Sequence, residues 1–164
     1  MKQDRFLVWI LVFIGVLVIA ALVLFVVRKD AQVYLADDAP EGVIHNYALA
    51  LQKQDFQRAY DYLAEKEYKP DYEVFRRAFL TNQLDITRNA LQVGTVQYLS
   101  ADEATVSVSV LYPGDGPFSQ GWSSNDTAAL VLQSGNWKLS YMPYPYWSYD
   151  WYLQPQLAPQ KVQP

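Results

Sequence analysis

An uninterrupted apolar segment from Phe6 to Val27 constrains the fold of this chain more than any other feature of its sequence. The segment contains no charged residue, and a helix of this length, with a rise of about 1.5 Å per residue, extends over roughly 33 Å. A cleaved secretory signal has a shorter apolar region and a small-residue cleavage motif, whereas here Arg28 and Lys29 follow directly. The sequence therefore predicts one uncleaved transmembrane helix at residues 6–27, after a short flank at residues 1–5.

The charges beside this segment do not decide its orientation. Lys2 and Arg5 precede it, while Arg28 and Lys29 follow it, so the positive residues are balanced between the two sides. The short N-terminal flank and the C-terminal position of the remaining chain favour export of the C-terminal part. We expect a single-pass protein of the cell membrane whose C-terminal domain is extracytoplasmic.

The composition excludes several classes of site and partner. The chain has no cysteine, which excludes disulfide bridges, thiolate metal sites and the acylated cysteine of a lipoprotein. Its formal net charge is −4, and the basic residues outside the flanks of the apolar segment are scattered. Because nucleic-acid binding needs a clustered basic face, we expect no nucleic acid partner. The expected partners are the bilayer, through residues 6–27, and one or more proteins at the membrane.

Residues 28–37 are a linker of mixed polarity, and a helical pattern begins directly after it. Asp38 is the expected N-cap, because its carboxylate can accept from free backbone N–H groups, and Pro40 suits the first turn. His45, the only histidine, is expected on the exposed side of this helix. The buried side is predicted to be an apolar stripe of Val43, Ile44, Tyr47, Ala48 and Leu51.

Two shorter helical segments follow. Asp55 is the expected N-cap of the first of them. Its apolar stripe consists of Phe56, Ala59, Tyr60 and Leu63. The second begins at Pro70 and Asp71 and is predicted to end around Thr81 and Asn82.

Strand patterns replace the helical ones from residue 91 onward. Residues 91–99 predict a strand with a bulge or bend at Gly94. In residues 104–112, Val106, Val108 and Val110 alternate with hydroxyl-bearing residues, which predicts one buried and one polar face. The connection between these two strands is short enough for a hairpin.

A second hairpin is predicted at residues 127–142, where Ser134 and Gly135 supply the tight turn. Residues 113–126 are rich in loop signals, and part of this segment is compatible with a further strand. Helices followed by strands predict an α+β fold. We expect an N-terminal transmembrane helix, then two to three helices packed on a curved antiparallel sheet of about four strands, with the domain at residues 38–142.

Three groups of residues also resemble a known family. They are Pro40–Ile44 with Tyr47–Leu51, Asp55–Phe56 with Ala59, Tyr60 and Leu63, and Gly135–Leu139. On these motifs the chain resembles membrane-anchored bacterial members of the nuclear-transport-factor-2-like superfamily. The resemblance implies a cystatin-like cone, in which a curved sheet wraps the helices and a cavity opens at one end. Members include isomerases, dehydratases, polyketide cyclases and proteins of no known activity.

The enzymes of that superfamily place an Asp, His or Tyr inside the cavity, and no residue here matches such a motif. His45 has no neighbouring carboxylate cluster, so it falls short of the usual metal-ligand sets. The pair Asp37 and Asp38 is expected to cap a helix rather than to bind calcium. Asp61, Asp85 and Asp102 lie in polar segments and are expected on solvated faces or in turns. We therefore expect no catalytic residue, no cofactor and no metal site.

The aromatic segment at residues 143–154 stands out most from the rest of the sequence. Pro143 and Pro145 exclude a helix and predict an extended chain close to polyproline II. The candidate interaction surface consists of Tyr144, Tyr146, Trp147, Tyr149, Trp151 and Tyr152. Four interpretations remain open: a strap over the helices or the mouth of the cone, a surface for a partner protein, a platform for sugars, and a membrane contact. Residues 155–164 are predicted to be a disordered tail.

Three functions are compatible with these observations. The leading hypothesis is a non-catalytic, single-span membrane protein whose extracytoplasmic domain binds or scaffolds a partner. The first alternative is an accessory subunit of a larger membrane protein complex, docked through its span and its aromatic segment. The second alternative is a small-molecule enzyme of the isomerase or cyclase kind, which needs a cavity holding an Asp, Tyr or His with a shifted pKa.

Overall fold

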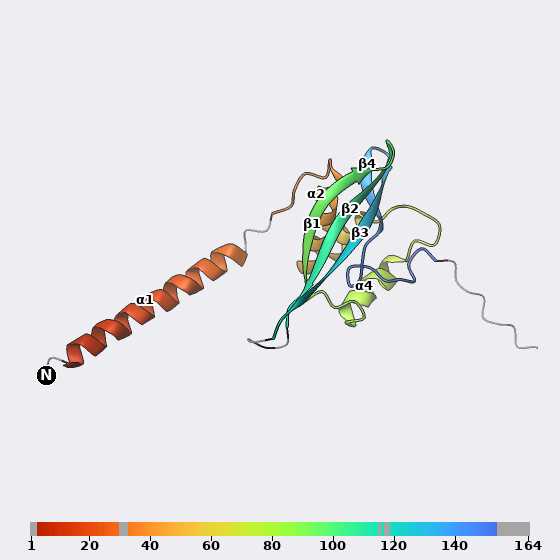
Figure 1. The fold of residues 1–164 in the computed structure, drawn as a ribbon. Coiled ribbons are helices and arrows are strands. Elements are labelled where there is room, and N and C mark those ends of the chain that lie inside the picture. The colour runs from red at the N-terminus through yellow and green to blue at the C-terminus, as the bar shows by residue number, and fades with distance from the viewer. Residues whose placement is uncertain (1–2, 30–32, 115, 117–118, 154–164) are drawn as a thin grey trace, which may run out of the picture. The chain divides into compact units, whose positions relative to one another are not determined.

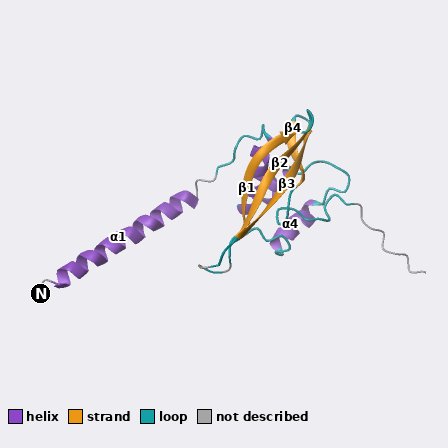
Figure 2. Ribbon diagram, in the orientation of Figure 1, coloured by secondary structure: helices purple, strands orange, loops and turns teal. Residues whose placement is uncertain are grey.

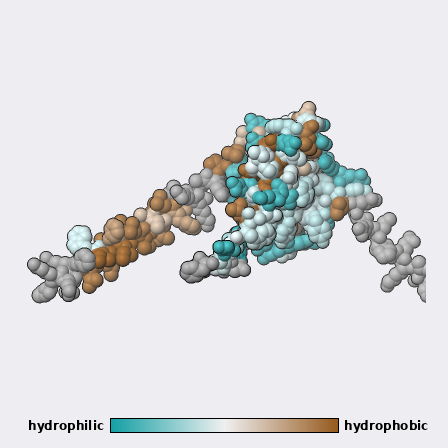
Figure 3. Space-filling model, in the orientation of Figure 1, coloured by the Kyte–Doolittle hydropathy of each residue, from teal (hydrophilic) through white to brown (hydrophobic). Residues whose placement is uncertain are grey.

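The computed structural model describes residues 3–29, 33–114, 116 and 119–153, so the predicted tail lies outside the described residues. The chain divides into two compact units, Met1–Val33 and Tyr34–Pro164. The first unit contains helix α1, Gln3–Lys29 (Figure 1). Within α1, the stretch Leu7–Phe25 has a mean hydropathy of 3.3 and none of it is buried, as its apolar surface in Figure 3 illustrates. The helix is therefore long and apolar enough to cross a membrane.

The second unit is α+β, as the sequence predicts (Figure 2). Its helices are α2, Pro40–Gln52, α3, Phe56–Asp61, and α4, Tyr72–Leu80. Its strands are β1, Ala90–Tyr98, β2, Glu103–Tyr112, β3, Trp122–Gln133, and β4, Asn136–Tyr141. The strands form one antiparallel sheet in the order β1-β2-β3-β4, so each strand pairs with the next along the chain. Helix α2 lies against one face of this curved sheet (Figure 1).

The first two strands follow their sequence pattern closely. Val106, Val108 and Val110 of β2 are buried, as the alternation predicts. The register between β1 and β2 shifts between Val93 and Val96, which places a bulge at Gly94. A Cβ atom at Gly94 would lie 2.5 Å from the Ser107 hydroxyl oxygen, so the bulge needs a glycine there.

The second hairpin also follows the sequence, although β3 is longer than the apolar pattern indicates. Ser134 and Gly135 have φ angles of 52° and 79°, which is the left-handed geometry that a two-residue turn between β3 and β4 requires. Strand β3 begins at Trp122, where it pairs with Tyr112, rather than at residue 127. Its first half is polar, and pairing with the full length of β2 makes it a strand.

The start of α2 differs from the sequence prediction. Ala39 is the N-cap, and no side chain caps the helix, so the prediction that Asp38 is the cap is wrong. The backbone before α2 passes very close to the first turn, because a Cβ atom at Gly42 would lie 2.2 Å from the Ala36 carbonyl oxygen. This close passage of residues 34–37 brings the Asp37 carboxylate to the Asn46 amide and the Tyr62 hydroxyl instead.

Helix α3 is shorter than its predicted stripe. The Asp55 carboxylate caps it by accepting from the Arg58 backbone N–H at 3.2 Å, as predicted. The helix ends at Asp61, however, so Leu63 lies beyond it. Leu63 forms a parallel bridge with Leu139 of β4 and is fully buried there. The chain after α3 thus covers the edge of β4.

Helix α2 is buried on more than the predicted stripe, and the polar residue Asn46 shows why. The Asn46 side chain is fully buried. Its amide oxygen accepts from the Leu35 backbone N–H at 2.8 Å, and its amide nitrogen donates to the Leu35 carbonyl oxygen at 2.8 Å. The side chain therefore satisfies the backbone of the incoming chain at Leu35 and joins it to α2.

We predict that Asn46→Ala lowers the free energy of unfolding by about 1–3 kcal/mol, because it leaves backbone groups of Leu35 without their partner. Denaturant unfolding of the full chain in neutral detergent measures this change. Asn136→Ala is the matched control, since Asn136 is exposed and its amide bonds only within its own turn, to Ser134. Equal losses in the two variants would contradict this role of Asn46.

Candidate functional site

The aromatic segment folds into consecutive turns rather than an extended chain. The Tyr146 backbone N–H donates to the Pro143 carbonyl at 2.9 Å, and the Trp151 N–H donates to the Ser148 carbonyl at 3.2 Å. The prediction of a polyproline II conformation is therefore wrong. The prolines do exclude a helix, as expected, but the chain turns after them so that Tyr146 and Trp147, which follow Pro145, are buried.

Three of the six predicted interaction residues belong to the core. Tyr146, Trp147 and Trp151 are buried, with 0%, 4% and 6% of their surface exposed. Tyr152 is partly buried and packs against this core. The remaining two, Tyr144 and Tyr149, are 60% and 87% exposed. The structure thus reduces the predicted surface to two rings of the segment.

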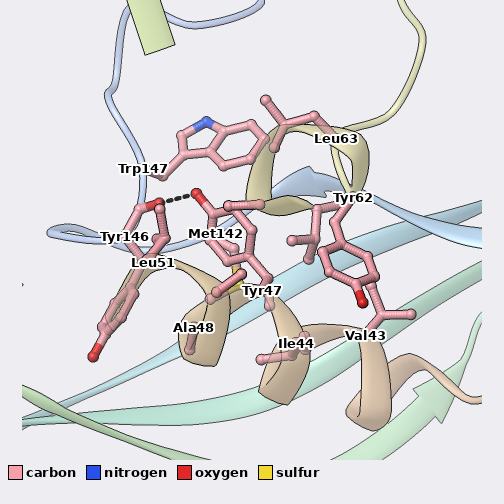
Figure 4. Packing of buried hydrophobic residues seen from close by; sticks show 14 of the residues in the cluster. Val43, Ile44, Tyr47, Ala48, Leu51, Tyr62, Leu63, Met142, Tyr146 and Trp147 are labelled. Carbon is pink, nitrogen blue, oxygen red and sulfur yellow. Dashed lines mark hydrogen bonds between the residues drawn. The ribbon is translucent and has the colours of Figure 1, made fainter. Parts of the chain in front are cut away.

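Tyr47 of α2 links the aromatic segment to the centre of the domain. Its hydroxyl donates to the Tyr146 carbonyl oxygen at 2.6 Å, and both residues are fully buried (Figure 4). Met142 lies beside them in the same cluster (Figure 4). These side chains fill the space between α2 and the start of the segment.

The rest of the segment packs on α4 and on the chain after α3. The Trp151 ring lies 5.2 Å from the Phe75 ring and 6.2 Å from the Phe79 ring, measured between centroids. The Tyr152 hydroxyl donates to the Ala64 carbonyl at 2.6 Å, and its backbone N–H donates to the Tyr68 carbonyl at 3.1 Å. Contacts on several elements make the segment an integral part of the domain.

Burial also changes the titration of these tyrosines. It raises the pKa of Tyr47 well above its usual value, and the nearby Tyr152 and Tyr146 phenols raise it further. Burial raises the pKa of Tyr146 to about 12, with a smaller contribution from Tyr112. Both hydroxyls therefore stay protonated at neutral pH, and the Tyr47 hydroxyl acts as a hydrogen-bond donor in the core.

The other residues that the sequence singles out lie apart from one another. His45 is partly buried rather than exposed as expected. Asp61 accepts from the Gln57 amide at 2.9 Å, and Asp102 accepts from the Ser100 hydroxyl at 2.6 Å. Asp85 accepts from both the backbone N–H and the hydroxyl of Thr87. Within the described ranges, no three acidic, histidine or cysteine residues come together as a metal site would require.

A pocket of about 290 Å³, here called the helix-end pocket, is a feature that sequence reasoning missed. It is lined by the last turn of α2, the turn into α3, the end of α4 and the loop that leads to β1. A wider hollow of about 490 Å³ lies beside Tyr112 and Trp122, whose rings stack at 4.0 Å between centroids. The helix-end pocket combines segments that are far apart in the sequence, so no local pattern predicts it.

Comparisons with known proteins give structural neighbours only. The sequence matches no family model and no curated protein. An NTF-2 like protein of unknown function from Shewanella oneidensis MR-1 is 11% identical over 60% of this chain and 88% of that chain, with a TM-score of 0.44.

Two further neighbours are 14% identical to this chain. A ketosteroid isomerase-like protein from Erwinia carotovora atroseptica SCRI1043 matches over 61% of this chain and 87% of that chain, with a TM-score of 0.42. A protein of unknown function with a cystatin-like fold from Nostoc punctiforme PCC 73102 matches over 59% and 80%, with a TM-score of 0.46. The neighbours thus include members of the superfamily that the motifs resemble, and at these identities the likeness concerns the fold alone.

We predict that Trp151→Ala lowers the free energy of unfolding by about 3–5 kcal/mol, because it removes a buried ring that contacts α4. Tyr149→Ala, two residues away on the exposed side, should change it by less than about 0.5 kcal/mol. Denaturant unfolding of the full chain in neutral detergent measures both values. A small effect for Trp151→Ala would show that the segment does not stabilise the domain.

The buried tyrosines also predict a loss of stability at alkaline pH. An unperturbed tyrosine has a pKa of about 10, so above that pH the unfolded chain releases phenolic protons that Tyr47 and Tyr146 retain when folded. Below about pH 9 these groups have no effect. Between about pH 10 and its raised folded-state pKa, each lowers the free energy of unfolding by up to about 1.4 kcal/mol per pH unit, and above that pKa its contribution levels off.

Denaturant unfolding between pH 8 and pH 11 tests this prediction. The decrease in stability with pH should become shallower in Tyr146→Phe and should keep its slope in Tyr149→Phe, because Tyr149 is exposed in the folded chain. An unchanged slope in Tyr146→Phe would contradict the assignment.

Proposed function

We propose that this chain is a single-span membrane protein whose α+β domain lies outside the cytoplasm and binds a partner there without catalysing a reaction. The observation that carries the proposal is the surface of Leu7–Phe25, which is apolar on every side and of which no part is buried. A helix that is hydrophobic all round is stable only when lipid or a protein core covers it. The rest of the chain folds as a separate unit with a complete core of its own.

The filled interior of the domain supports binding rather than catalysis. Tyr47, Tyr146 and Met142 are fully buried and fill the space between α2 and the start of the aromatic segment. General acid or base catalysis needs a titratable group that can reach a substrate. The buried polar side chains of the described residues are Asn46 and Ser148, and both are hydrogen-bonded within the protein. Recognition would therefore use the outer surface of the domain and the pockets that open at it, rather than these buried groups.

Single-cysteine variants test the proposed topology, because the chain itself has no cysteine. In intact cells, a membrane-impermeant maleimide should label Gln97→Cys, which is an exposed position on β1. It should label Gln3→Cys, on the other side of the span, only after the cells are lysed. The opposite pattern would overturn the orientation.

Two further measurements test the anchor itself. The full-length protein should stay in the membrane fraction during alkaline carbonate extraction, and its intact mass should include residues 1–27. Release into the soluble fraction would overturn the anchor. Loss of the N-terminal residues would show that the apolar helix is a cleaved signal.

A further inference from the structure

The helix-end pocket lies where two helices end. Helices α2 and α4 both end at it, with Gln52 and Phe79 of their last turns in its wall. The C-terminal end of a helix carries a partial negative charge that attracts cations within the last turn. Two such ends meet at this pocket, while the N-terminus of the short helix α3, which begins at Phe56 in the same wall, is capped by the Asp55 carboxylate. The helix ends together with that cap therefore favour a positively charged guest.

Asp85 adds a full negative charge to the same wall. It is the one charged residue among those that line the pocket. The Thr87 hydroxyl and backbone N–H, at 2.6 and 2.9 Å, lower the pKa of Asp85, so the carboxylate is ionised at neutral pH. The Thr87 bonds also hold the carboxylate in a fixed position in its loop.

Aromatic rings and amides complete the lining. The Phe56 and Phe79 rings stack with their centroids 6.2 Å apart and their planes at 19°. The faces of such rings attract cations through their quadrupoles. Gln52, Gln54 and Asn82 add amide oxygens that can accept hydrogen bonds. In such a pocket the positive charge of a guest would face Asp85 and the amide oxygens, and its apolar part would contact the Phe56 and Phe79 rings.

The backbone of the pocket wall is held in an uncommon conformation. Gln54 and Asn82, which follow the ends of α2 and α4, have φ angles of 58° and 56°. The backbone N–H of Gln54 donates to Leu51 at 3.0 Å, and that of Asp55 donates to Ala50 at 2.8 Å, so α2 ends in a motif that usually places glycine at the left-handed position. The chain has Gln54 there instead, which places an amide side chain in the pocket wall.

We propose that the helix-end pocket binds a small organic cation, with its ammonium group beside Asp85 and its alkyl groups against Phe56 and Phe79. A volume of about 290 Å³ suits a guest of this kind. Two basic residues lie near the pocket without lining it. Arg88 attracts the Asp85 carboxylate, and the Lys53 ammonium lies 5.0 Å from the Tyr34 ring centroid. The guest therefore competes with Arg88 for Asp85.

Choline and its neutral isostere 3,3-dimethylbutan-1-ol are suitable probes, because they share a shape and differ in charge. Each is titrated into the full chain in neutral-detergent micelles, and backbone amide chemical shifts give the dissociation constants. Choline should shift the amides of Asp85 and Thr87 and bind at least about five-fold more tightly than the isostere. Equal affinities, or no shifts at these amides with choline, would overturn the proposal.

Variants separate the pocket from general attraction to an acidic protein. Asp85→Asn retains an oxygen that can accept from Thr87, and it should bind choline no better than the isostere. Asp102→Asn is the matched control, because Asp102 is an exposed turn carboxylate that does not line the pocket. Unchanged choline binding in Asp85→Asn, or an equal loss in Asp102→Asn, would overturn the site.

Two more variants keep the test independent of the folding of Asp85→Asn. Phe56→Leu retains an apolar side chain but removes a ring, and it should weaken choline binding about two- to five-fold. Arg88→Gln removes the competing cation and should strengthen choline binding. Changes in the opposite directions would overturn the proposal. None of these binding measurements depends on the orientation of the membrane span. Failure of the cation site can therefore be distinguished from failure of the topology, which the maleimide labelling tests.

Discussion

The hydrogen bond from the Tyr47 hydroxyl to the Tyr146 carbonyl is the interaction on which the rest of the domain depends. A buried carbonyl without a partner costs about 1–3 kcal/mol, and a phenol buried at the same place would lose as much. Each group therefore requires the other, although 99 residues separate them along the chain. The bond joins α2 to the aromatic segment, while Asn46 joins the incoming backbone to the same helix.

The parts of this fold that the sequence predicts are those with local causes. Val106, Val108 and Val110 alternate with hydroxyl-bearing residues because successive side chains of a strand point to opposite faces of the sheet. Ser134 and Gly135 form a tight hairpin turn because both adopt positive φ angles. Gly94 marks a bulge for the same kind of reason. The cap at Asp38 fails because the backbone from residues 34–37 occupies that region, and no local pattern indicates where that backbone passes.

The aromatic segment and the helix-end pocket depend on distant contacts, and the sequence predicts them only in part. The number of rings in the segment is compatible with both a strap and a surface. Trp151 is buried because it packs against Phe75 and Phe79 of α4 and against Trp147. The sequence predicts that Asp85 lies on a solvated face or in a turn, and in the structure it accepts two hydrogen bonds from Thr87 in a loop. Its position in the pocket at the ends of α2 and α4 arises only when these helices pack together.

The long separation between Tyr47 and Tyr146 has a consequence for how the domain is made. The ribosome synthesises α2 well before Tyr146, which covers its Tyr47, and before Trp151, which covers α4. During synthesis the apolar surface of α2 and the phenol of Tyr47 have no native partner, and such surfaces attract chaperones or associate with one another. The domain can complete its core only after residues 146–151 have left the ribosome.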